Sequence, residues 1–135
     1  MGWALALKSV ALAVGAMVVN VAASFLWVFI YSMLIEPGHD EAFYEAYAMR
    51  SAPWCSVVAG MPILFGAGWL LARWHGGGWQ TGIWAAVVYI LIDVAILASA
   101  GMLGALLAIE ALSYATKLGA AALGGRIAAR RLAKA

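Results

Sequence analysis

Residues 9–35 read SVALAVGAMVVNVAASFLWVFIYSMLI and contain no charged side chain. A helix needs about 20 predominantly apolar residues to cross a bilayer, so this stretch is long enough to span a membrane. Residues 51–72 are also free of charge and predict a second span. We place the first two spans at residues 10–35 and 53–73.

The apolar region that follows Arg73 is too long for a single crossing. Asp93 is its only charged residue before Glu110, and one helix over this distance would be about 54 Å long at about 1.5 Å per residue. The hydrocarbon core of a bilayer is only about 30 Å thick. Residues 99–104, SAGMLG, contain two glycines and suit a turn. We therefore place the third and fourth spans at residues 79–99 and 103–123.

The composition also indicates a membrane protein. Hydrophobic residues make up 67% of the 135 residues and charged residues 10%, whereas a soluble domain is about half apolar and a quarter charged. A chain of this length has too little interior to bury so many apolar side chains. The single cysteine, Cys55, excludes an intrachain disulfide and a cysteine-based zinc site. We expect a single all-α membrane domain.

The positions of Lys and Arg predict its orientation. In a four-span arrangement one side of the membrane holds Lys8, Arg73 and the basic tail at residues 124–135, while the other side holds only Arg50. Because cytoplasmic segments carry the excess of Lys and Arg, we expect a four-helix bundle in a bacterial inner membrane with both termini cytoplasmic. A three-span alternative, with a surface amphipathic helix at residues 110–134, would place the basic tail outside.

The first span has some features of a cleavable leader. Lys8 precedes an apolar run that contains Val21-Ala22-Ala23, a possible cleavage site. The apolar run continues to Ile35, however, and is therefore longer than the apolar core of about 7–15 residues in a leader. We expect this segment to remain as an uncleaved span.

Residues 36–50 connect the first two spans and predict a short helix on the outer membrane surface. Pro37 and Gly38 end the first span, and Asp40 can cap the new helix. Together with His39, the carboxylates of this segment could hold a divalent metal ion or form a solvated acidic surface. We expect the acidic surface and no metal. These carboxylates belong to Glu36, Asp40, Glu41 and Glu45.

Polar side chains within the spans are the strongest functional signal. An ionisable residue at the membrane centre costs about 2.5–3.5 kcal/mol to insert and usually faces the interior or a functional site. Helical spacing groups these residues into three stripes. The stripes are Asn20 with Ser24 on span one, Tyr89 with Asp93 on span three, and Glu110 with Tyr114 and Lys117 on span four.

Asp93 and Glu110 should lie at the same depth. Each is about eight residues from the outer turn, or about 13 Å at the helical rise. Pro62 of span two lies at a similar depth and can act as a hinge, because proline removes a backbone hydrogen bond. Side chains lean toward the N-terminus of their helix, so Lys117 should pair with Glu110 or Asp93. The predicted ion or substrate site contains Asp93, Glu110, Lys117, Asn20, Ser24, Tyr89 and Tyr114.

These features predict two classes of function. The first is a small oligomeric transporter or channel that binds a proton or cation at the intramembrane carboxylates. The alternative is a non-catalytic accessory or lipid-binding subunit of a larger membrane complex, in which the buried charges only set helix register. No nucleophile, metal or nucleotide motif indicates an enzyme or a cofactor.

The expected partners are membrane lipids and either a second copy or a larger complex, not nucleic acid. A basic segment next to a membrane attracts anionic headgroups, by about 1 kcal/mol per residue. The residues expected to contact headgroups are Arg126, Arg130, Arg131 and Lys134.

Overall fold

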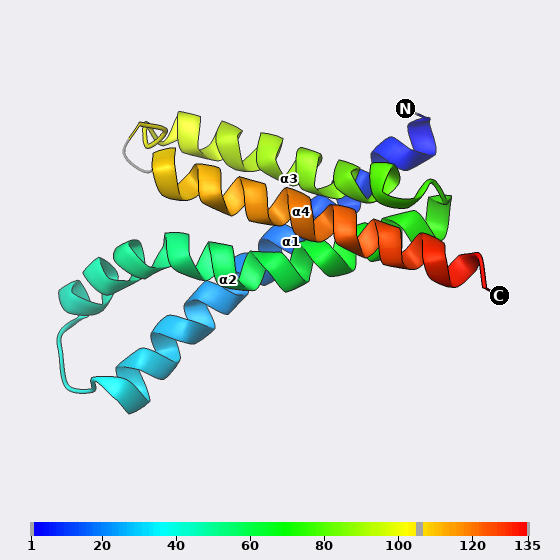
Figure 1. Cartoon of the computed structure of the whole chain (residues 1–135). Helices are drawn as coiled ribbons and strands as arrows, with labels where there is room; N and C mark the ends of the chain where they lie inside the picture. Colours follow the sequence, from blue (N-terminus) through cyan, green and yellow to red (C-terminus); the bar gives the residue numbers. More distant parts are fainter. Residues whose placement is uncertain (1, 105–106, 135) are drawn as a thin grey trace.

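The computed structural model describes residues 2–104 and 107–134, and every regular element in these ranges is helical (Figure 1). Helix α1 is followed without a break by a π-helical turn, η1, and three further α-helices complete the described chain. The elements are α1 (Trp3–Ile30), η1 (Tyr31–Ile35), α2 (Glu41–His75), α3 (Gly78–Ser99) and α4 (Leu107–Leu132).

Three of these helices are long and apolar enough to cross a membrane: α1 with η1, α2 and α3. Helix α4 is less apolar because it carries Glu110, Lys117 and the C-terminal arginines. The chain is therefore an all-helical membrane protein with three candidate spans among its described residues, and α4 is a fourth helix packed against them.

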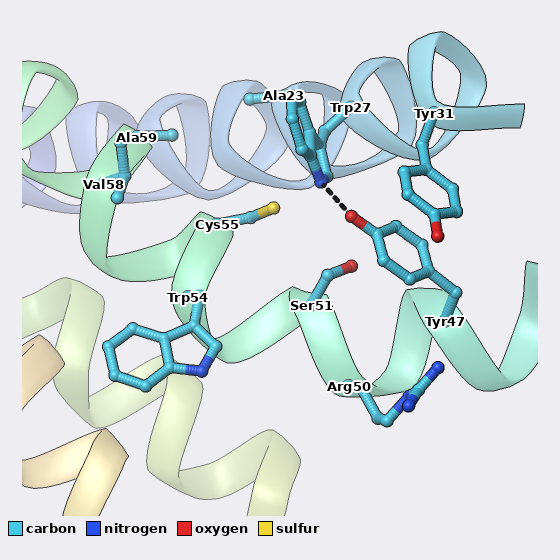
Figure 2. Close-up of a pocket in the computed structure, with 10 residues that line it drawn as sticks. All are labelled: Ala23, Trp27, Tyr31, Tyr47, Arg50, Ser51, Trp54, Cys55, Val58 and Ala59. Atoms are coloured by element: carbon cyan, nitrogen blue, oxygen red, sulfur yellow. Dashed lines mark hydrogen bonds between the residues drawn. The ribbon is translucent and has the colours of Figure 1, made fainter. Parts of the chain in front are cut away.

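Residues 41–50 do not form a separate surface helix, contrary to the expectation from the sequence. Asp40 caps the helix as expected, since its side chain accepts a hydrogen bond of 3.0 Å from the Phe43 backbone N–H. The helix then continues through Pro53 to its end at His75. Pro53 removes one backbone hydrogen bond, and this loss bends the helix. No glycine lies beside Pro53 to end the helix there. The ribbon of α2 changes direction between Ser51 and Val58 (Figure 2).

Glycines form the turns at both ends of α3, where the sequence predicts breaks. Gly76, Gly77 and Gly78 have φ angles of 74°, 79° and 63°, and Gly101 has a φ of 69°. These positive values belong to the left-handed region, which glycine adopts without the steric cost of a Cβ atom. The turns allow α3 to return along α2, and α4 to return along α3.

Helix α4 packs between α2 and α3 at very short range. It contacts both, while α1 contacts the same two helices, and Figure 1 shows α4 in front of α1. A Cβ atom on Gly68 would overlap the backbone of Ala121, and one on Gly124 would overlap the backbone carbonyl of Phe65. A Cβ atom on Gly82 would lie 2.6 Å from the Ala121 carbonyl oxygen. Small residues thus allow backbone contact between helices.

Gly124 and Gly125 do not separate a basic tail from the fourth helix. Helix α4 runs through both glycines to Leu132, and both are buried in helix contacts. Their lack of a side chain therefore serves packing. The C-terminal basic residues continue the helix that holds Lys117.

Both termini lie at the same end of the molecule (Figure 1). This basic end also contains the α2–α3 turn, whereas the opposite, acidic end contains the α1–α2 loop. The basic end carries Lys8, Arg73, Arg126, Arg130, Arg131 and Lys134. The acidic end carries Glu36, Asp40, Glu41, Glu45 and Arg50.

Candidate functional site

Four polar side chains, one from each α-helix, meet in the interior. We call Asn20, Ser56, Tyr89 and Lys117 the central polar cluster. The Asn20 side-chain amide donates to the Tyr89 hydroxyl at 2.9 Å and to the Ser56 hydroxyl at 3.2 Å. The Lys117 ammonium donates to the same Ser56 oxygen at 2.7 Å. Ser56 Oγ is therefore the common acceptor that joins α1 and α4 through α2.

Lys117 is completely buried, with an exposed fraction of 0%. Besides Ser56, its ammonium meets the faces of two aromatic rings, 4.6 Å from the Tyr89 centroid and 5.9 Å from the Tyr114 centroid. A cation over a ring face is attracted to it, more strongly when desolvated. Gly60 makes space for this side chain, because a Cβ there would lie 2.5 Å from Lys117 Cε.

The expected ion pair between Lys117 and a carboxylate is absent from the described residues, where no carboxylate oxygen lies within 4.0 Å of its nitrogen. The physical reason is the path of the side chain, which passes over Gly60 and reaches Ser56 on α2. Glu110 lies two helical turns away along α4. The ammonium is therefore solvated by a hydroxyl and two rings.

Asp93 on α3 is held by Tyr114 on α4, which is not a member of the central polar cluster. The Tyr114 hydroxyl on α4 donates to Asp93 Oδ2 on α3 at 2.7 Å. Tyr114 thus contacts the carboxylate with its hydroxyl and lies near the Lys117 ammonium with its ring face. This tyrosine links Asp93 to the central polar cluster without a direct ion pair.

Two polar atoms on the inner face of α4 are buried without a hydrogen-bond partner among the described residues. They are Glu110 Oε2 and Ser113 Oγ. On α1, Asn20 Oδ1 is likewise buried without a hydrogen-bond partner among these residues. A buried polar group without a partner costs about 1–3 kcal/mol, so these atoms are the places where a proton, a water molecule or an ion would gain most by binding.

Ser24 and Pro62, although expected at the site, form no side-chain hydrogen bond with the central polar cluster or with Asp93. The Ser24 hydroxyl donates to the Asn20 backbone carbonyl of its own helix at 3.2 Å. Pro62 is exposed, and α2 remains helical on both sides of it. The position of α2 that does reach the cluster is Ser56.

The connecting segment and the basic residues lie at opposite surfaces. In the loop, Glu36 lies 3.4 Å from His39 and accepts a hydrogen bond from the Tyr31 hydroxyl. Residues 2–104 and 107–134 contain no group of three or more side chains placed to hold a metal ion.

Arg126 lines a surface groove of about 570 Å³ beside Trp79. The four basic residues expected to contact lipid headgroups are all exposed.

Ser56 and Gly60 are the members of the site that sequence reasoning did not assign to it. They were visible only as a small-residue pair, Ser56-x3-Gly60, of the kind that permits close helix packing. Serine carries no charge and is common outside functional sites. Its spacing from Gly60 therefore did not show whether Ser56 forms hydrogen bonds or only permits close packing. No protein-family model matches this sequence, and no curated protein or solved structure is significantly similar to it.

Proposed function

We propose that this chain is a four-span inner-membrane protein that binds a proton or monovalent cation between α3 and α4 and couples this binding to transport. The observation that carries the proposal is the convergence of Asp93, Glu110 and Lys117 on the inner faces of two adjacent helices. Lys117 is completely buried, Asp93 is bonded to Tyr114, and Glu110 presents a buried oxygen. Ionisable residues at such positions generally serve ion pathways or proton relays.

The charges of this group do not balance. Two carboxylates and one ammonium sum to a formal charge of −1 in a region surrounded by apolar helix faces. A net charge is expensive to keep in a medium of low dielectric constant. One proton or one monovalent cation would neutralise the group, and the unpartnered Glu110 oxygen is available to receive it. Release of the proton or cation would restore the charge of −1. Coupled transport requires this alternation between a neutral and a charged state.

The hydroxyls around Lys117 offer a route for a proton. Tyr114 contacts Asp93, while Tyr89 and Ser56 contact the amide of Asn20 on the other side of the ammonium. Hydroxyl groups both donate and accept, so each can pass a proton along. Asp93 and Asn20 would mark the two ends of this polar layer across the helices.

A conduction path would form between copies of the chain. Glycine contacts hold α4 so closely against α2 and α3 that these three helices enclose little space. One face of α1 exposes large apolar side chains that a second copy or lipid can cover. These side chains belong to Val14, Val18, Val21 and Phe25.

The separation of charge between the two ends of the molecule supports the proposed orientation. The basic end holds both termini and would face the cytoplasm, as the distribution of Lys and Arg in membrane proteins favours. Helix α4 is less apolar than the other three, but its Tyr114 and Lys117 side chains point into the contacts with α3 and α2. Packing against α2 and α3 would thus allow α4 to cross the membrane beside the other three helices.

Flux measurements test the proposal. Purified protein is reconstituted in liposomes that contain a pH-sensitive dye, and proton and sodium or potassium fluxes are recorded for wild type, Asp93→Asn and Glu110→Gln. Glu45→Gln, an exposed carboxylate of the acidic end, is the matched control. We expect flux that both intramembrane variants reduce and the control retains. No flux in wild type, or equal flux in all variants, would remove the transport function.

A further inference from the structure

A groove of about 800 Å³ separates the C-terminal half of α1 from the N-terminal part of α2 (Figure 2). It is distinct from the central polar cluster, since none of the four cluster residues lines it. Its lining includes Ala23, Tyr31, Tyr47, Arg50, Val58 and Ala59.

The lining changes from polar to apolar along the helices. Tyr31, Tyr47 and Arg50 lie toward the acidic end, whereas the far end is formed by apolar side chains. Arg50 and Ala59 are nine residues apart on α2, or about 14 Å at the helical rise. A ligand that lies along the groove therefore meets a cation and hydroxyls first, and a hydrocarbon floor further in.

The polar end is built in advance by aromatic contacts. Trp27 Nε1 donates to the Tyr47 hydroxyl at 2.8 Å. The Tyr47 ring stacks on Tyr31, with centroids 3.7 Å apart and planes 7° from parallel. These contacts join α1 and η1 to α2, and tryptophan and tyrosine are the residues that prefer the headgroup level of a membrane.

The Arg50 guanidinium is free to bind an anion. It is exposed at the groove, is the only Lys or Arg of the acidic end, and has no carboxylate within 4.0 Å among the described residues. The four acidic residues of that end lie nearby in the sequence, yet none pairs with it. A guanidinium presents a planar fork of donors that matches phosphate oxygens in a bidentate manner.

We infer that this groove binds one phospholipid molecule, with its phosphate on Arg50 and an acyl chain along the floor formed by Ala23, Val58 and Ala59. The volume lies within the range of about 300–1,000 Å³ that small-molecule sites occupy. The order of chemistry along the groove is that of a lipid in the leaflet at the acidic end: a phosphate, an aromatic interfacial layer and a hydrocarbon chain. This site is independent of the proposed transport.

Cys55 provides a direct readout because it is the only cysteine and lines the groove. The rate of alkylation of Cys55 by N-ethylmaleimide is measured on the delipidated full chain in detergent, while dioleoyl phosphatidylglycerol is titrated. Bound lipid covers the thiol, so a lipid concentration of about ten times its Kd should slow alkylation by about tenfold. Dioleoylglycerol, which has the same chains without phosphate, and glycerol 3-phosphate, which has no chains, should protect far less.

Variants of two exposed arginines separate headgroup recognition from a general effect of detergent or charge. Arg50→Gln should require about tenfold more phospholipid for the same protection, because a charge-assisted phosphate contact is lost. Arg73→Gln, at the opposite end, should behave as wild type. Helical circular dichroism confirms that both variants are folded.

Three results would overturn the inference. Alkylation of Cys55 that does not respond to phosphatidylglycerol would show that no lipid enters. Equal protection by dioleoylglycerol, unchanged in Arg50→Gln, would show that the phosphate is not recognised. Protection that follows the protein concentration and not the lipid concentration would show that a second copy of the chain fills the groove.

Discussion

The side-chain nitrogen of Asn20 lies 2.9 Å from the hydroxyl of Tyr89, and the two residues are 69 positions apart in the chain. This bond joins the middle of α1 to the middle of α3 inside the apolar part of the protein. The same amide also contacts Ser56, on which Lys117 depends for its only hydrogen bond among the described residues. The orientation of α1 and the environment of the buried ammonium are therefore coupled through one amide group.

The first prediction concerns this coupling. In a double-mutant cycle of Asn20→Ala and Tyr89→Phe, the coupling free energy should be about 0.6 kcal/mol and at most about 1.7 kcal/mol, the mean and the maximum measured for hydrogen bonds between membrane helices. SDS-induced unfolding followed by circular dichroism measures it. Ser24→Ala, which removes only a bond to the backbone of its own helix, should cost little. Strictly additive effects of the first two substitutions would contradict the hydrogen bond.

The second prediction concerns the charge of Lys117. Lys117→Met removes the charge-assisted hydrogen bond to Ser56 and changes the formal charge of the group from −1 to −2, so it should lower the free energy of unfolding by about 1.5–3 kcal/mol. Adding Asp93→Asn restores the formal charge to −1 and should recover part of this loss. The exposed Arg130→Met is the control and should change little. A double variant less stable than Lys117→Met would argue against charge compensation.

The third prediction concerns the contact between α2 and α4. Gly124→Ala places a Cβ against the Phe65 carbonyl and should destabilise the protein by about 1–3 kcal/mol, as overpacking generally does. Gly119→Ala, on the same helix with open space around it, should be neutral or stabilising by up to about 1 kcal/mol. The midpoints of SDS-induced unfolding compare the two. Equal midpoints would mean that α4 does not approach α2 at Gly124.

The fourth prediction concerns the space that Gly60 leaves for the lysine side chain. Gly60→Ala should destabilise the wild-type chain, because its Cβ meets Lys117 Cε at 2.5 Å. In a Lys117→Ala background the same substitution meets no such atom, so its cost should largely disappear. The two costs are compared by thermal unfolding in detergent. An equal cost in both backgrounds would place the lysine side chain elsewhere.

The fifth prediction concerns orientation. In a Cys55→Ser background, Arg130→Cys should react with a membrane-impermeant maleimide only when the cytoplasmic side of the membrane is accessible. Glu45→Cys, at the acidic end, should react only from the opposite side. The two cysteines are assayed in intact cells and in inverted membrane vesicles. Labelling of both from one side would exclude the four-span topology.

The presence of the helices and the polar stripes was accessible from the sequence, whereas the continuation of α2 from Glu41 through Pro53 and the partners within the site were not. Asp93 and Tyr114 were both assigned to it, yet nothing in their spacing indicated that they bond to each other. Lys117 was assigned a carboxylate partner because side chains lean toward the N-terminus of their helix, which is the direction of Glu110. The hydroxyl of Ser56 is the group within reach, since the path over Gly60 directs the ammonium toward α2.

Hydropathy and charge spacing can be read from short stretches of the chain, and they were sufficient to identify a helical membrane protein, its glycine turns and the few charges along its helices. Which polar groups touch depends instead on the position of each helix along its axis and on its rotation about that axis, relative to its neighbours. Contacts such as those of Gly124 with Phe65 and of Gly82 with Ala121 set these parameters. They join residues far apart in the chain, and only the folded arrangement brings Asn20, Ser56, Tyr89 and Lys117 to one point.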